Sequence, residues 1–87
     1  MDSFGSMLYR LRVDYFGKQQ CLALSIGCTE AAVSFWESER RLPSPQLLSK
    51  LVKRLIKAGA SATEVKELVT TYQNEQARKH FSKLPNF

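Results

Sequence analysis

Apolar residues recur at helical spacing from the start of the chain. In the first segment they stand at i, i+3, i+4, i+7 and i+11, which places them on one face of a helix. The members of this stripe are Phe4, Met7, Leu8, Leu11 and Tyr15. Ser3 supplies an N-cap and Gly17 a stop, so the pattern predicts a helix from about Ser3 to Phe16. The sequence contains no strand-like alternation, which indicates an all-α fold.

Two short helices are predicted next, separated by a glycine. The first begins near Lys18 and ends at Gly27, which can adopt the left-handed conformation that terminates helices. Its apolar positions are Leu22, Ala23 and Ile26. Thr29 then offers a side-chain oxygen as N-cap for a third helix that ends near Ser38. The stripe of this third helix consists of Ala32, Val33 and Trp36.

Two longer helices complete the pattern after a loop at residues 39–43. Ser44 and Pro45 open the fourth helix, and Gly59 terminates it. Its wide apolar face comprises Leu47, Leu48, Leu51, Val52, Leu55 and Ile56, and the opposite side carries Lys50, Lys53, Arg54 and Lys57. Residues 61–64 fit a capping box that opens a fifth helix running to about Lys79. The apolar stripe of that helix is Val65, Leu68, Val69 and Tyr72.

The second and third helices have the residues that a helix-turn-helix needs on steric grounds. Ala23 is small where the two helices would cross, and Gly27 allows the tight turn between them. Their shared core would be formed by Leu22, Ile26, Val33 and Trp36. This joint spacing, followed by a glutamate, a basic loop and a proline, predicts a helix-turn-helix.

The segments that carry this pattern resemble the Cro and phage-repressor family of helix-turn-helix proteins, also called the xenobiotic-response-element family. The resemblance covers residues 4–57 and runs through Phe4-Gly5-Ser6-Met7-Leu8, Leu11-Arg12, Gln19-Gln20-Cys21-Leu22-Ala23, Ile26-Gly27-Cys28-Thr29, Val33-Ser34-Phe35-Trp36-Glu37 and Arg40-Arg41-Leu42-Pro43-Ser44. It implies a compact five-helix, lambda-repressor-like bundle. We expect one DNA-binding domain over residues 1–80 with a short tail at 81–87.

The resemblance also implies which residues meet DNA. Bases would be read from the start and exposed face of the third helix by Thr29, Glu30, Ala31, Ser34 and Phe35. Phosphates would be contacted by Lys18, Gln19, Arg40 and Arg41. Glu30 can accept a hydrogen bond from cytosine N4, and Ala31 can meet a thymine methyl group. Because the set holds no bidentate Arg, Asn or Gln, specificity would depend on methyl contacts, DNA shape and backbone register.

Several of these residues have a second interpretation. Trp36 and Glu37 fit structural roles, the first in the core and the second as an anchor for a neighbouring backbone group or arginine. Phe35 could contact DNA or pack against a neighbour, and Glu30 could simply stabilise the helix dipole. The family usually has Gly at the position of Glu39, where a backbone turn with positive φ would cost about 1 kcal/mol in a non-glycine residue.

Net charge and composition limit the classes of partner and cofactor that the sequence favours. The net charge of +5 resides in residues 43–87, with eight basic and three acidic side chains, whereas residues 1–42 hold five of each. A basic chain favours polyanions. Cys21, Cys28 and the single histidine His80 provide no zinc ligand set and no nucleophilic constellation, so we expect no enzyme, metal or cofactor. The sequence has neither a signal peptide nor 18 consecutive apolar residues, which favours the cytoplasm and no membrane.

The sequence therefore predicts a transcriptional regulator, such as a small Cro-like repressor, a controller or an antitoxin, that binds a palindromic double-stranded operator as a homodimer. The dimer would form through Val65, Leu68, Val69 and Tyr72, unless this stripe closes the core of the single chain. The alternative function is a helix-turn-helix scaffold for protein interaction. In that case Phe35 and residues 73–87 would contact a toxin or an RNA polymerase subunit.

Overall fold

Five helices make up most of residues 3–82, the part of the chain that the computed structural model describes. They are α1 (Phe4–Tyr15), α2 (Gln19–Ile26), α3 (Glu30–Glu37), α4 (Pro45–Ala58) and α5 (Ala62–Ser82). No strand occurs within this range, so the prediction of an all-helical protein is confirmed. No helix among these residues has the length and apolar character needed to cross a membrane.

The predicted helix boundaries agree with the observed caps. The side chains of Ser3, Thr29 and Ser44 accept hydrogen bonds from the backbone N–H three residues ahead, at the starts of α1, α3 and α4. The capping box also forms, because the Ser61 N–H donates to the Glu64 carboxylate at 2.9 Å while the Glu64 N–H donates to the Ser61 hydroxyl at 3.1 Å.

The fifth helix is longer than expected. It continues to Ser82, beyond the predicted end near Lys79, because the sequence has no Gly or Pro between Gly59 and Pro85 to stop it. The first two positions of the predicted tail therefore belong to α5, and residues 83–87 lie outside the described residues.

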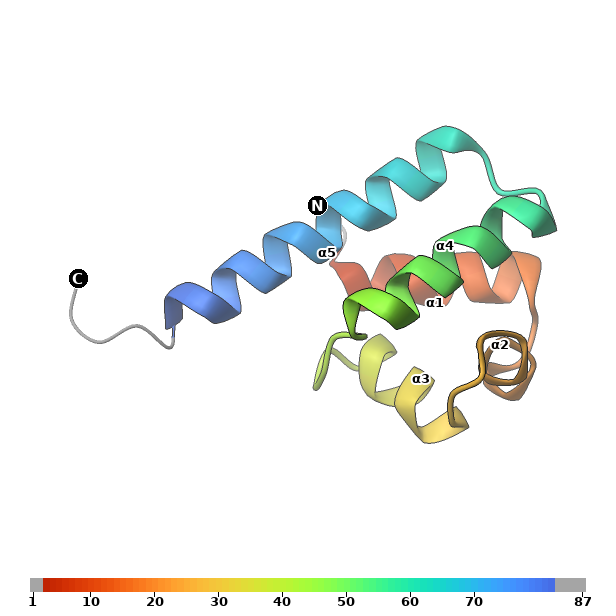
Figure 1. Cartoon of the computed structure of the whole chain (residues 1–87), viewed down its shortest axis with the longest axis horizontal. Helices are drawn as coiled ribbons and strands as arrows, with labels where there is room; N and C mark the ends of the chain where they lie inside the picture. Colours follow the sequence, from red (N-terminus) through yellow and green to blue (C-terminus); the bar gives the residue numbers. More distant parts are fainter. Residues whose placement is uncertain (1–2, 83–87) are drawn as a thin grey trace.

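The helices bury one continuous apolar core. Figure 1 shows α1 and α4 in the middle of the molecule, with α2 and α3 on one side and α5 on the other. The predicted stripes supply most of the core: Phe4, Met7, Leu8, Leu11, Leu22, Ala23, Ile26, Val33, Trp36, Leu51, Leu55, Val65, Leu68 and Tyr72. Ile56 is an exception, because it lies at the border of the α4 stripe and is 58% exposed.

The close contact between α1 and the end of α3 requires a glycine at position 5. A Cβ atom on Gly5 would lie 2.5 Å from the carbonyl oxygen of Glu37 and 2.6 Å from Cγ of Glu39. Neither distance is compatible with normal van der Waals packing. The absence of a side chain at Gly5 therefore lets α1 approach the backbone where α3 ends.

Candidate nucleic-acid interface

A left-handed glycine connects α2 to α3. Gly27 has φ of 73° and caps α2, and its backbone N–H donates to the carbonyl oxygen of Ala23. Ala23 is itself buried, and α2 packs directly against α3. Gly27 thus ends α2 in the left-handed conformation that the sequence predicted, and Ala23 is one of the buried residues of α2.

The outer face of α3 carries one acidic side chain and two short ones. Glu30, Ala31 and Ser34 are exposed, whereas Val33 and Trp36 on the inner face are buried. Thr29 is exposed too, but its hydroxyl accepts the Ala32 N–H at 3.1 Å and caps the helix. The predicted reader positions therefore lie together on one accessible surface, with Thr29 committed in part to the cap. The core interpretation of Trp36 is confirmed.

Phe35 packs against its own chain. Its ring is half-buried, and the guanidinium carbon of Arg41 lies 5.4 Å from the ring centroid, within the range of a cation–π contact. The backbone N–H groups of Arg40 and Arg41 both donate to the Phe35 carbonyl oxygen, at 3.0 and 3.4 Å. The basic loop is therefore folded back onto the end of α3, beside the reader surface.

A buried carboxylate joins α1, α2 and α3. Glu37 accepts hydrogen bonds from Arg12, whose Nη2 lies 3.1 Å from Oε1, and from the Gln19 side-chain amide, whose Nε2 lies 3.0 Å from Oε1. Arg12 Nε donates to the other carboxylate oxygen, and Nη1 donates to the Gly17 carbonyl oxygen. The proposed anchoring role of Glu37 is confirmed, because one side chain fixes the relative positions of three helices.

This network limits what Gln19 can offer to DNA. One amide proton of Gln19 is used by Glu37, which leaves the second amide proton and the backbone N–H for a phosphate. Lys18 provides no side-chain cap for α2. The uncapped backbone N–H groups at the start of α2 are suitable donors to a phosphate oxygen.

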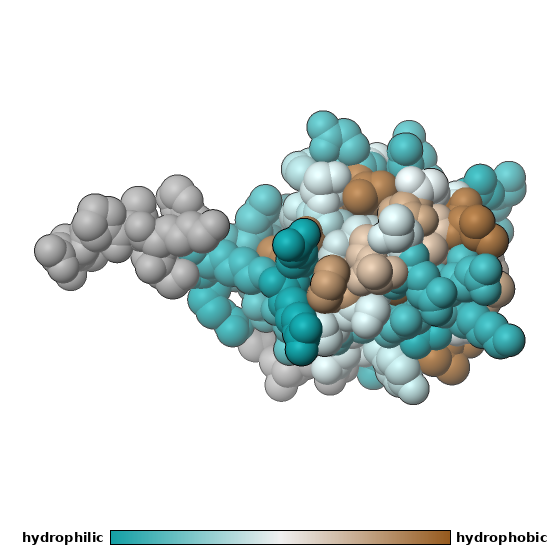
Figure 2. Space-filling view, turned by 90° about the horizontal axis from the view of Figure 1, so that it is seen from below, coloured by the Kyte–Doolittle hydropathy of each residue, from teal (hydrophilic) through white to brown (hydrophobic). Residues whose placement is uncertain are grey.

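Exposed cations lie on both sides of α3 along the chain. Lys18 lies at the start of α2, and Arg40 and Arg41 lie in the loop after α3; all three are exposed. Figure 2 views the molecule from the side of α2 and α3, and teal hydrophilic side chains border a paler and partly brown centre. Lys18, Arg40 and Arg41 are the exposed cations that the sequence analysis assigned to phosphate contacts.

The predicted dimer stripe lies mostly inside the single chain. Val65, Leu68 and Tyr72 are buried against α1 and α4, and Val69 is half-buried. Phe4 and Tyr72 form an edge-to-face aromatic pair with ring centroids 5.7 Å apart. Within the single chain these side chains close the core, which is the alternative that the sequence left open for this stripe.

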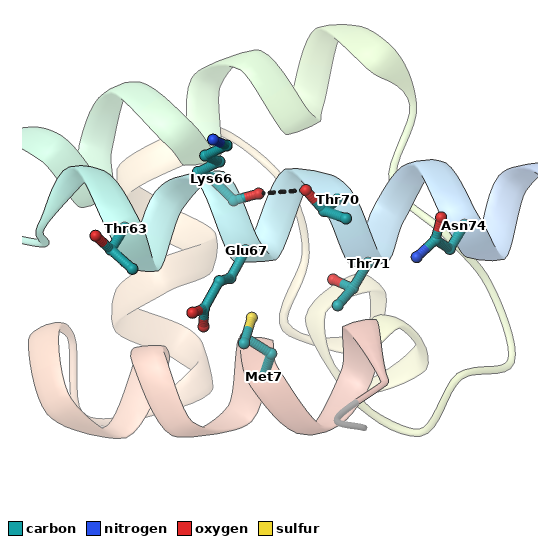
Figure 3. A pocket seen from close by; sticks show the side chains of 7 residues that line it. All are labelled: Met7, Thr63, Lys66, Glu67, Thr70, Thr71 and Asn74. Carbon is teal, nitrogen blue, oxygen red and sulfur yellow. Dashed lines mark hydrogen bonds between the residues drawn. The ribbon is translucent and has the colours of Figure 1, made fainter.

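A hollow lies between α1 and α5. Its volume is about 580 Å3, and its lining consists of Met7, Thr63, Lys66, Glu67, Thr70, Thr71 and Asn74 (Figure 3). The Thr70 hydroxyl donates to the Lys66 carbonyl oxygen of the same helix, at 2.9 Å. The lining includes one cationic side chain, Lys66, and one anionic side chain, Glu67. Apart from Met7, the lining residues stand along α5 and do not converge on a point. We assign no chemistry to the hollow.

A second groove lies between the loop after α3 and the far end of α5. It has a volume of about 530 Å3 and is lined by Arg40, Arg41, Leu42, Pro43, Ser44, Pro45, Tyr72, Gln76 and Lys79. We call it the basic groove, because its lining includes three cationic side chains and no carboxylate. The sequence analysis missed the contribution of α5. The available signal was that Gln76 and Lys79 follow Tyr72 at i+4 and i+7, so that its buried face continues as a polar one.

Comparisons of the chain with models of protein families, with curated proteins and with solved structures found no match.

Proposed function

We propose that this protein is a sequence-specific DNA-binding regulator in which α2 and α3 form a helix-turn-helix within a lambda-repressor-like bundle. The observation that carries the proposal is the surface of α3. Ala31 and Ser34 are short enough to let the helix approach base edges, and Lys18, Arg40 and Arg41 stand around it where phosphates would run. We further propose that it acts in the cytoplasm as a repressor-type regulator and that it has no enzymatic activity.

Two experiments test this function. Selection from a random duplex library by the full chain should enrich one sequence motif, because a base-reading helix discriminates each contacted pair by about 1–3 kcal/mol. Binding of the enriched duplex should weaken steeply as salt rises, because phosphate contacts release counterions. A library that remains random after selection, or binding that is indifferent to salt, would exclude this function.

Homodimerisation is a separate part of the proposal. A palindromic motif in the selection, with half-sites about 34 Å apart, would indicate two recognition helices related by a twofold axis. Light scattering on the free protein would show whether the dimer exists before DNA is bound. Because Val65, Leu68 and Tyr72 are internal, variants at these positions test folding and not assembly.

A protein-interaction module is the second candidate, and one observation favours it. Leu24 on α2 and Ile56 on α4 are 76% and 58% exposed, and the two helices pack against each other. Large apolar side chains at the surface of neighbouring helices are typical of protein contacts. Leu24→Ser and Ile56→Ser should leave DNA binding unchanged if the DNA proposal holds, and they should abolish binding of a partner such as a toxin or a polymerase subunit under the alternative.

A further inference from the structure

The end of α5 continues well past the packed core. Tyr72 is the last buried residue among those up to Lys79, where the description of side chains ends, yet the helix runs on to Ser82, about three turns beyond Tyr72. Figure 1 shows this end projecting beyond the other four helices. The side chains at 73–79 are mainly polar and exposed. A helix of this kind gains little from tertiary packing, so its surface is available to a partner.

One side of this projecting segment forms a wall of the basic groove. Gln76 and Lys79 line it together with Arg40 and Arg41 of the loop after α3, and Ser44 at the start of α4 lines it too. The walls are held together by a buried hydrogen bond of 2.8 Å from the Tyr72 hydroxyl to the Pro43 carbonyl oxygen. Three cationic side chains thus line one hollow, and they come from two elements that are distant in sequence.

Two acidic side chains, Glu39 and Glu75, lie near the basic groove without lining it. Glu75 pairs with Arg78 at 3.3 Å, and Glu39 and Glu75 line a separate small hollow that Lys79 also borders. Lys79 is half-buried, which restricts its position between the two hollows. The basic groove itself therefore presents cationic and neutral polar groups to an anion.

The basic groove also adjoins the reader surface of α3. Arg41 lines the groove, and its guanidinium packs on the ring of Phe35. In Figure 2 the teal side chains extend from the border of the central surface toward the projecting end of α5. An anion in the groove would thus lie next to the strand whose bases α3 reads.

We propose that the basic groove binds backbone phosphates of the duplex, so that the C-terminal half of α5 is a second DNA-contacting element beside α3. This inference rests on the proposed function. It assigns to Lys79 and Gln76 a contact outside the helix-turn-helix, and it extends the footprint of the protein along the phosphate backbone. Such contacts are independent of sequence, so the groove would strengthen binding to all duplexes alike.

A gain of affinity tests the groove better than a loss, because misfolding cannot produce it. Gln76→Lys adds a cation to the groove wall, and Gln73→Lys makes the same change on the same helix outside the groove lining. Binding of a labelled random-sequence duplex to the full chain is measured across a salt series by fluorescence anisotropy. Gln76→Lys should raise affinity on the order of fivefold to tenfold at about 0.1 M salt and increase the salt slope by about 0.9.

The loss variant and its control complete the experiment. Lys79→Gln should lower affinity and salt slope by similar amounts, whereas Lys66→Gln, which lies in the other hollow of α5, should have a much smaller effect. Equal gains from Gln76→Lys and Gln73→Lys would overturn the inference, because net charge alone would then explain them. In that result the wild-type chain still binds duplex with a steep salt dependence, and the proposed function survives. A wild-type chain that binds no duplex would overturn both.

An acidic protein is the competing ligand for this groove, and a poly-glutamate peptide is its probe. If Gln76→Lys strengthens binding of the peptide and leaves the duplex unaffected, the groove is a protein site and the inference is overturned. Under the DNA proposal, the duplex responds to the substitution and displaces the peptide.

Discussion

The hydroxyl of Tyr72 donates a hydrogen bond to the carbonyl oxygen of Pro43, 2.8 Å away and 29 residues earlier in the chain. Both residues are buried, and burial raises the pKa of the Tyr72 hydroxyl, which therefore stays protonated as a donor at neutral pH. The bond fastens the loop that carries Arg40 and Arg41 to α5. It thereby links the stability of the fold to the geometry of the candidate interface.

Tyr72→Phe should consequently destabilise the protein and weaken DNA binding together. Removal of the hydroxyl leaves the buried Pro43 carbonyl without this donor, which costs about 1–3 kcal/mol. In a domain of this size each 1 kcal/mol lowers Tm by roughly 4–8 °C. Thermal unfolding followed by circular dichroism measures the effect. Tyr9→Phe, at a 55% exposed tyrosine, is the matched control and should change Tm little; equal shifts in both variants would contradict the role of the bond.

The ion pair of Arg12 and Glu37 gives a second prediction. Both side chains are less than a tenth exposed, at 9% and 7%. Arg12→Leu alone should therefore cost about 3–5 kcal/mol, because it leaves a buried carboxylate without its cation. The double variant Arg12→Leu with Glu37→Leu should recover much of that loss. Urea unfolding of the two single variants and the double variant provides the coupling free energy, and additive losses would show that the two side chains act independently.

Glu39 is held in a left-handed conformation that favours glycine. Its φ is 66°, and it is the one non-glycine residue with positive φ in the described range. Glu39→Gly should therefore stabilise the fold. Relief of the left-handed strain contributes about 1 kcal/mol, and the greater conformational entropy of glycine in the unfolded chain reduces this gain. Ser38→Gly, at φ of −86°, is the control and should be neutral or destabilising. A lower midpoint of urea unfolding for Glu39→Gly would mean that contacts of the Glu39 side chain with α1 outweigh the strain.

The stability of the protein at low pH should depend on Glu64. This carboxylate accepts hydrogen bonds from the Ser61 N–H and from the Tyr15 hydroxyl at 2.7 Å, and these bonds lower its pKa from the ordinary value of 4.5. A carboxyl with a lowered folded-state pKa stabilises the protein above its unfolded pKa, and this contribution is lost as pH falls through the folded value. Tm of the wild type should thus decline between about pH 6 and about pH 3 more than Tm of Glu64→Gln. Glu67→Gln should retain the wild-type decline; an unchanged profile for Glu64→Gln would contradict the assignment.

The sequence was sufficient to predict the five helices, because their signals are local. Each predicted capping residue caps the helix that it was expected to open: Ser3 caps α1, Thr29 caps α3, Ser44 caps α4 and Ser61 caps α5. Apolar periodicity likewise identified nearly all of the core. Periodicity identifies the apolar face of a helix, but it does not show which part of the protein packs against that face. The α5 stripe therefore could have packed inside the chain or across a dimer, and only the folded structure places it inside.

The candidate site likewise has features that the sequence could predict and features that it could not. The exposed positions of α3 follow from its period, once Val33 and Trp36 are assigned to the core. The buried ion pair was less accessible to sequence reasoning, because a charged residue on the apolar face of α1 has no local signal that names its partner on α3. The basic groove depends on a contact between α5 and a loop far away in the chain. Such long-range features require the packing of the whole bundle.

The reader surface itself leads to the last prediction, which concerns thymine methyl groups. Ala31 and Phe35 offer only apolar atoms to a base edge, and the 5-methyl group of thymine is the apolar feature of the major groove. If the selected operator contains thymine opposite α3, replacing that base by uracil should lower affinity, within the range of about 1–3 kcal/mol for a specific contact. Phe35→Ala should lower affinity for the thymine duplex and abolish the difference between thymine and uracil, whereas Ser34→Ala should preserve it. Anisotropy titrations of both proteins against both duplexes form a thermodynamic cycle. A uracil penalty that persists in Phe35→Ala would assign the methyl contact to another residue, with Ala31→Gly as the next variant to titrate.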